Sequence, residues 1–318
     1  MEMAPDAVRG EILRLAHSGL DFQEFARAGM RVLRRAVPFD AVAVVAFDPT
    51  TGVPVDTWSD EFELESADVE RFRQLAASGR RAARFSGELR AVCVGDTGMW
   101  GAILMRREPG APAFTTRDVD LLASLSGGHP EVQRAKLERS LAADADDRDP
   151  GLLLLDEDDG VDMANAGAAA WLDDLPDHGR RLPFVVTAVA ERARAIASGH
   201  DDSPASARVR AASGRWVLVS GSVVRNGTRV RTAVTLEPAR APELAEILAH
   251  AYGLTARERC VTKLVAQGLP TAAMAARLHL STYTVQDHLK AIFEKLDVTS
   301  RGELVARLFL DRHLVGSA

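Results

Sequence analysis

The apolar residues of the first 140 positions change from helical to strand spacing and back. A helical pattern begins the chain and ends at Pro38, because proline breaks a helix. Its apolar members are Ile12, Leu15, Phe22, Phe25, Met30, Leu33 and Val37. The run AVAVVAFD at 41–48 is typical of a strand, and the turn residues DPTTG follow it.

Further helices are predicted at 66–78 and 115–126, where serine, threonine and aspartate favour a helix start. Between them, strands at 90–95 and 99–106 flank the turn GDTG and predict a hairpin. Helix, strand, helix, hairpin and helix together predict an α+β sheet with helices at its ends.

A second α+β pattern starts near residue 151. A strand in LLLL, an acidic turn and another short strand precede Asn165, which is expected to open a helix of small residues. A helix at 183–197 follows, and then two strands joined by Asn226-Gly227. This dipeptide favours a type I′ hairpin turn.

Short helices are predicted from Leu254 to the end of the chain. Thr255 and Glu258 predict a capping box for the first, and Gly268 its end. The next two are separated by the tight turn HLS, with Ser281 expected as the N-cap of the later helix, which predicts a helix-turn-helix. The buried stripe of that later helix is expected to be Val285, Leu289, Ile292 and Leu296, at i, i+4, i+7 and i+11.

Two seams divide the chain into three predicted units. The segment 142–151 is acidic and ends in Pro-Gly, and 237–243 holds two prolines, so both are interpreted as linkers. The predicted fold class is therefore multidomain, with two α+β units followed by an all-α unit of four helices.

Composition fits a globular chain, since 47% of the 318 residues are hydrophobic and 26% are charged. No apolar run approaches the roughly 18 residues that cross a bilayer, and no secretory signal is recognised, so a cytoplasmic protein without membrane contact is expected. Cys93 and Cys260 have apolar neighbours and are expected to be buried and unpaired. No His/Cys spacing predicts a metal site.

The net charge of −6 conceals an asymmetry. Residues 254–318 hold nine Lys or Arg against six Asp or Glu, so this segment carries +3 and the remainder −9. Only the C-terminal unit is therefore suited to a polyanion such as DNA.

The first unit, over about 10–140, resembles a GAF sensor domain. The resemblance rests on AVAVVAFDPTTG after PFD and on WGAILMRREPGAPAFTTRDVDLLASL. It implies sensing of a small molecule or of light, but Cys93, His17 and His129 are interpreted as structural residues, and no cofactor is expected.

The middle unit, over about 148–238, resembles a PAS domain, through GLLLLDEDDGVDMANAGAAAWL and the two strands after it. Two interpretations stay open for this unit. It either only dimerises or transmits a signal, or it holds a ligand in a pocket.

The C-terminal unit, 250–313, closely resembles the LuxR-type (GerE-like) helix-turn-helix family. The matching residues are Leu254, Thr255, Arg257, Glu258, Arg259, Ala266, Gly268, Met274, Ala275, Leu278, Leu280, Ser281, Thr284, Val285, His288, Leu289, Lys295, Leu296, Val298 and Arg301. The resemblance implies a four-helix domain that binds double-stranded DNA as a homodimer through its last helix, 301–310.

The same resemblance implies a set of DNA-binding residues. Bases would be contacted by Gln286, Asp287 and Lys290, and phosphates by Thr271, Ser281, Thr282 and Thr284. Helix capping is the alternative role for some of these hydroxyls, and a capping residue can also contact phosphate.

Three departures from the family pattern weaken the expected attraction to phosphate. The second helix starts Pro270-Thr271-Ala272-Ala273, without the usual cap and lysine. Gln286 stands where a basic residue is common, and Asp287 where a neutral one is. Base readout remains available, because glutamine pairs with adenine and aspartate accepts from cytosine N4.

No enzyme motif is present, whether GxxxxGK[ST], GxSxG or HExxH, so no catalytic residues are predicted. The sequence therefore predicts a transcriptional regulator with a small-molecule effector in the GAF-like or PAS-like unit and RNA polymerase as a candidate partner. The alternative is a sensory interaction module whose helix-turn-helix binds a protein.

Overall fold

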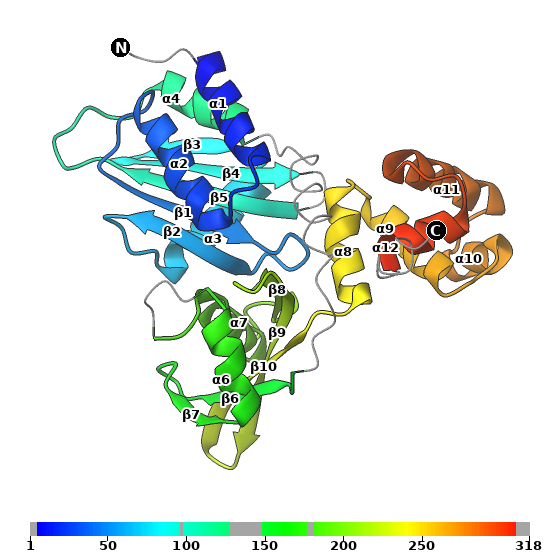
Figure 1. The fold of residues 1–318 in the computed structure, drawn as a ribbon. Helices are drawn as coiled ribbons and strands as arrows, with labels where there is room; N and C mark the ends of the chain where they lie inside the picture. Colours follow the sequence, from blue (N-terminus) through cyan, green and yellow to red (C-terminus); the bar gives the residue numbers. More distant parts are fainter. Residues whose placement is uncertain (1–4, 96–97, 127–147, 177–180, 310–318) are drawn as a thin grey trace.

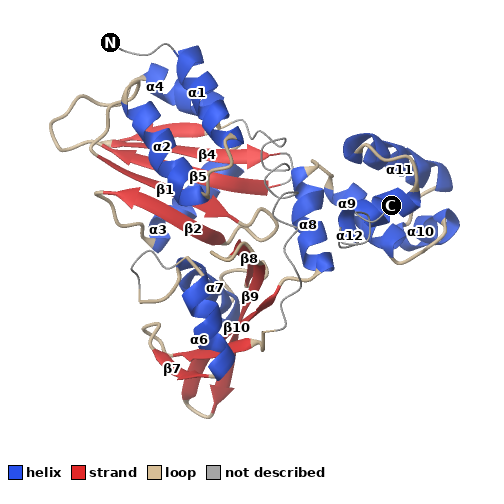
Figure 2. Ribbon diagram, viewed as in Figure 1, coloured by secondary structure: helices blue, strands red, loops and turns tan. Residues whose placement is uncertain are grey.

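The computed structural model describes residues 5–95, 98–126, 148–176 and 181–309. They form two five-stranded antiparallel sheets with helices, followed by a helical C-terminal region (Figures 1 and 2). The predicted α+β character of the N-terminal part and the all-helical C-terminal part are confirmed. Within the described ranges, no helix is long and apolar enough to span a membrane.

The first sheet has the strand order β2-β1-β5-β4-β3 and carries helices on both faces. Its elements are α1 (Pro5–His17), α2 (Phe22–Arg34), β1 (Ala41–Phe47), β2 (Pro54–Asp60), α3 (Ser66–Ala77), β3 (Ala82–Phe85), β4 (Glu88–Gly95), β5 (Gly98–Arg106) and α4 (Thr116–Leu125). Val42 and Val44 pack with α1, α2 and α4, whereas Ala43 and Val45 pack with α3. Successive strand residues point to opposite faces, so the apolar run of β1 is buried on both sides.

The helical pattern before Pro38 is interrupted and forms two helices. Gly19 has a φ of 83° after α1. Asp21 then caps α2: its carboxylate accepts from the Glu24 N–H at 2.8 Å, and Glu24 accepts from the Asp21 N–H at 3.1 Å. The pattern also failed to predict β2 and β3, the two edge strands of this sheet.

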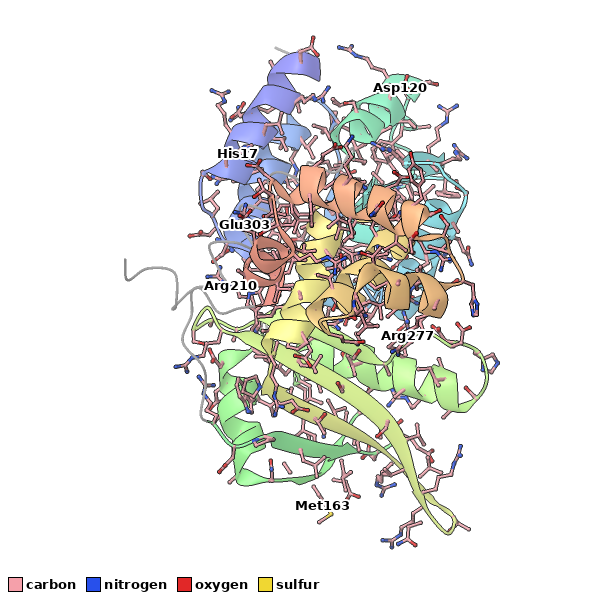
Figure 3. All side chains as sticks on the ribbon, turned by 90° about the vertical axis from the view of Figure 1, so that its right-hand side faces the viewer. His17, Asp120, Met163, Arg210, Arg277 and Glu303 are labelled. Atoms are coloured by element: carbon pink, nitrogen blue, oxygen red, sulfur yellow. The ribbon has the colours of Figure 1, made fainter. Side chains whose placement is uncertain are left out.

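The second sheet repeats the same relative order, β7-β6-β10-β9-β8. Its elements are β6 (Gly151–Leu155), β7 (Val161–Ala164), α6 (Ala166–Asp174), α7 (Phe184–Ala197), β8 (Ser206–Arg210), β9 (Trp216–Asn226) and β10 (Arg229–Pro238). Asn165 caps α6 as predicted, accepting from the Ala168 N–H at 3.0 Å. One face packs against α6 and α7, whereas Met163 on β7 is 64% exposed (Figure 3).

Two predictions for this sheet are wrong. The segment before Asn226 forms two strands, because Gly214, with a φ of 86°, allows a turn between β8 and β9. The hairpin loop is Gly227-Thr228, since Asn226 still pairs with Arg229. Only Gly227 of these two has a positive φ, 60°, which is the pattern of a type II′ turn rather than I′.

The segment 237–243, predicted as a linker, is mostly regular secondary structure. β10 runs to Pro238 and α8 (Ala241–Ala251) begins three residues later, so strand and helix follow almost directly. The helices after α8 are α9 (Ala256–Ala266), α10 (Thr271–Leu278), α11 (Thr282–Leu296) and α12 (Arg301–Phe309). All five share one apolar core. Residues 142–147 of the other predicted linker lie outside the described residues.

The three predicted units also pack against one another. Val53, after β1, is buried in the core of the second sheet, and Phe184 of α7 is buried in that of the first. Trp100 of β5 and Trp216 of β9 contact the C-terminal helical core. A change in either sheet can therefore reach the helices through direct contacts.

Both cysteines are free thiols, but one prediction about them is wrong. Cys260 lies on the outer side of α9 and is exposed. Cys93 of β4 is half-buried, and desolvation raises the pKa of its thiol to about 11. A raised pKa disfavours the reactive thiolate, which fits a packing role for Cys93.

Candidate nucleic-acid interface

The turn between α10 and α11 is fixed by local hydrogen bonds. His279 ends α10 in the left-handed conformation, with a φ of 54°, and the Leu280 N–H donates to the Ala275 carbonyl at 2.9 Å. Ser281 caps α11 as predicted, because its Oγ accepts from the Thr284 N–H at 3.0 Å. The two helices therefore keep a defined crossing.

The two faces of α11 divide as the sequence predicted. Its buried side chains are Val285, Leu289, Ile292 and Leu296. Gln286, Asp287 and Lys290 are exposed on the other side. Because the buried stripe holds the helix in the core, the exposed side chains are presented to solvent from a rigid support.

A partly buried ion pair joins α11 to α9. Glu258 is 5% exposed, and its carboxylate accepts from the Thr255 N–H at 2.8 Å and from Lys295 Nζ at 2.7 Å. Burial raises the pKa of Glu258. Hydrogen bonds from Lys295 and Thr255, together with the positive charge of Lys295, lower it more, so the pKa lies below its ordinary value. The carboxylate is therefore ionised at neutral pH and joins the start of α9 to the end of α11.

The structure places the predicted DNA-binding residues in two groups. Thr271, Gln286 and Lys290 line one shallow hollow of about 500 Å³ between α10, α11 and α12. Ser281, Thr282 and Thr284 lie together in the first turn of α11. Asp287 is exposed and does not line the hollow.

Arg301 also lines this hollow, although it was not among the predicted DNA-binding residues. Its Nη2 donates to Thr271 Oγ1 at 2.6 Å, and its Nη1 donates to the Leu269 carbonyl at 3.1 Å. A cation therefore lies beside the start of α10, where the sequence lacked the usual lysine. The contact joins residues 30 positions apart, so no local pattern signals it.

Tyr283 was also missed, although its position carried a signal. Its side chain is 72% exposed, an unusual environment for a large aromatic residue. It lies between Thr282 and Thr284 on the first turn of α11. A tyrosine hydroxyl is one of the groups that contact phosphate oxygens in protein–DNA complexes.

The C-terminal region thus belongs to the helix-turn-helix class, with an exposed polar helix carried on an apolar core. Residues 253–308 match the family model described as "Bacterial regulatory proteins, luxR family". These residues form a LuxR-type helix-turn-helix domain. Among the described residues, no group of His, Cys, Asp or Glu could hold a metal ion.

Similar proteins are named as regulators rather than enzymes. A protein of Aeromonas salmonicida named as an HTH-type transcriptional regulator is 48% identical over 62 residues, 20% of this chain and 31% of its own. The nitrate/nitrite response regulator NarL of Escherichia coli K12 is 28% identical over 53% of this chain and 77% of its own. The regulatory protein DesR of Bacillus subtilis is 38% identical over 24% of this chain and 40% of its own.

This chain therefore spans about a third of the first of these relatives. Among solved structures, residues 156–455 of PelD from Pseudomonas aeruginosa PA14 cover 78% of this chain and 84% of their own at 16% identity. The TM-score is 0.32, which is too low to support any conclusion. SdiA of Escherichia coli is 10% identical and covers 95% of this chain and 97% of its own. Its TM-score of 0.29 is likewise too low to support any conclusion.

Proposed function

We propose that the protein is a transcriptional regulator that binds operator DNA through α11. The match of residues 253–308 to the LuxR family carries this proposal. The exposed front of α11 supports it. Gln286, Asp287 and Lys290 are exposed to solvent there, and their side chains can hydrogen-bond to base edges in the major groove. Thr271, Ser281, Thr282 and Thr284, now joined by Tyr283 and Arg301, are the proposed phosphate contacts.

In this proposal the two sheet units are GAF-like and PAS-like sensors that control DNA binding or dimerisation. Their shared strand order and their contacts with the helical core support this arrangement. A homodimer would form through α12, on the side where Val305 and Ala306 are partly exposed, since Leu304 and Leu308 are buried within the chain. RNA polymerase is the proposed downstream partner.

Electrophoretic mobility shift across a salt series tests the proposal against its rival, a helix-turn-helix that binds a protein. The observed association constant for promoter DNA should fall as salt rises, with a log–log slope of about −0.9 per neutralised phosphate. The slope should become shallower in Arg301→Gln if this residue contacts phosphate. Genome-wide footprinting first identifies the candidate promoter fragments. Absent or salt-independent binding to these fragments would favour the rival.

Lys290→Ala should weaken binding to the operator by about 1–3 kcal/mol, because a base contact in the major groove is lost. Asp287→Asn should strengthen binding to non-operator DNA, because removing a carboxylate reduces the repulsion between α11 and the DNA phosphates. Fluorescence anisotropy with operator and scrambled duplexes measures both. Arg277→Ala, an exposed cation on α10 outside the hollow (Figure 3), is the matched control. An unchanged operator affinity in Lys290→Ala would place the contact surface elsewhere.

A further inference from the structure

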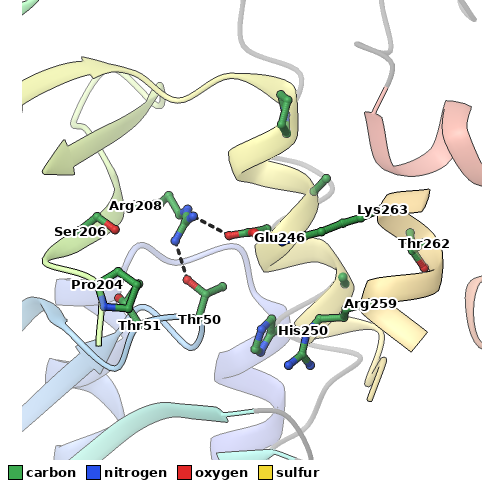
Figure 4. Close-up of a pocket in the computed structure, with 13 residues that line it drawn as sticks. Thr50, Thr51, Pro204, Ser206, Arg208, Glu246, His250, Arg259, Thr262 and Lys263 are labelled. Atoms are coloured by element: carbon green, nitrogen blue, oxygen red, sulfur yellow. Dashed lines mark hydrogen bonds and ion pairs between the residues drawn. The ribbon is translucent and has the colours of Figure 1, made fainter. Parts of the chain in front are cut away.

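A cavity of about 300 Å³ lies where α8 and α9 meet the two sheets (Figure 4). Thr50 contributes from the loop after β1, and Arg208 from β8. Glu246 of α8 and Lys263 of α9 contribute from the helical core. The cavity is therefore built by all three parts of the chain, and its volume is at the lower end of small-molecule sites.

The charge of the lining is mainly positive. The charged lining residues are Arg208, Arg259 and Lys263 against a single carboxylate, that of Glu246. Arg208 and Lys263 both donate to Glu246, whereas Arg259 Nη1 donates to the Leu254 carbonyl at 2.7 Å. Such a set of guanidinium and ammonium donors suits carboxylate or phosphate oxygens.

Arg208 provides a second, independent indication of a ligand. Its side chain is only 8% exposed, and its Nε–H is buried without a hydrogen-bond partner among the described residues. Its other nitrogens are engaged: Nη1 bonds to Asp48 Oδ2 at 3.2 Å, and Nη2 bonds to Glu246 Oε2 at 2.7 Å. An unsatisfied buried donor on a cation is costly unless a further acceptor binds there.

Glu246 already occupies the place of an anion in this cavity. One of its carboxylate oxygens accepts from Arg208 and the other from Lys263, so it bridges β8 and α9. Its side chain is 32% exposed and that of Lys263 is 56% exposed. Glu246 can therefore turn toward solvent and leave both cations to another acceptor.

We propose that this cavity binds a small anion carrying carboxylate or phosphate groups, which replaces Glu246 between Arg208 and Lys263. The bound anion would also accept from Arg208 Nε and from Arg259. Replacement breaks the direct ion pair between the second sheet and α8. An effect of this broken ion pair on DNA affinity would depend on the proposed function, whereas binding of the anion does not.

Isothermal titration calorimetry of the full chain tests the site, with inorganic phosphate and succinate as probes and glycerol as a neutral control at constant ionic strength. Glu246→Gln should bind the preferred probe about fivefold more tightly, because the competing ion pair is lost. Lys263→Gln should bind it about fivefold more weakly. Phosphate and succinate distinguish the two ligand chemistries, since the better fit gives the larger response.

Matched controls exclude a general charge effect. Glu243→Gln on α8 and Arg257→Gln on α9 change the net charge equally but do not line the cavity, and neither should alter binding. Equal responses in Glu243→Gln and Glu246→Gln would overturn the proposal, as would heats no larger than those of glycerol in both the wild type and Glu246→Gln. Melting temperatures confirm that each variant is folded.

Mobility shift on the same variants separates this proposal from the proposed function. Anion binding in the expected order without any DNA binding would overturn the regulator and leave the cavity site standing. Salt-dependent DNA binding without a calorimetric response to either probe would overturn the cavity site alone.

Discussion

Arg208→Ala is expected to lower the free energy of unfolding by about 3–5 kcal/mol, because it leaves a buried charge unpaired. That charge is Asp48, which is 1% exposed and accepts from both the backbone N–H of Arg208, at 2.8 Å, and its Nη1. Two hydrogen bonds from Thr50, at 2.8 and 2.6 Å, do not neutralise the carboxylate. Urea denaturation followed by tryptophan fluorescence measures the loss, since Trp100 and Trp216 contact the C-terminal core.

The control for Arg208→Ala is Arg210→Ala, two residues further along β8. Arg210 is exposed, and within the described ranges its side chain donates to the Gly214 carbonyl alone, at 3.2 Å, so its loss should change stability by about 0.5 kcal/mol or less. The double variant Arg208→Ala/Asp48→Asn should recover more than half of the lost stability, because the unpaired charge is gone. Equal, small effects of Arg208→Ala and Arg210→Ala would contradict this account of the junction.

The local features of the C-terminal domain could be predicted from the sequence. The apolar stripe of α11, the Thr255–Glu258 capping box and the Ser281 cap all depend on residues within one or two turns of helix. Periodicity and capping chemistry act over these distances, so the sequence pattern carries them directly.

The junction between the units could not be predicted in the same way. Asp48 and Arg208 are 160 positions apart, and neither stands in a pattern that identifies its partner. Arg301 reaches Thr271 across 30 positions for the same reason. The edge strand β2 was missed because its side chains do not alternate between buried and exposed. The two prolines of 237–243 did not indicate that β10 ends and α8 begins within this segment.

Leu289→Asp is expected to unfold the C-terminal helices. Leu289 is 7% exposed and packs in the middle of the α11 stripe, between Val285 and Ile292. Truncating a buried leucine costs about 2–5 kcal/mol, and burying an unpaired carboxylate costs several more. The sum is comparable to the roughly 5–15 kcal/mol that stabilises a typical domain.

Hydrogen exchange of peptides from α9 to α12 measures this unfolding, with Gln286→Asp as the control. Gln286 is exposed on the same helix, so the same carboxylate placed there should leave amide protection unchanged while weakening DNA binding. In Leu289→Asp, peptides from α9 to α12 should exchange rapidly, whereas β1 and β10 should keep their protection, because each lies inside its own sheet. Wild-type protection of α11 in Leu289→Asp would mean that this side chain faces solvent, and the division of α11 into a core face and a DNA face would then be wrong.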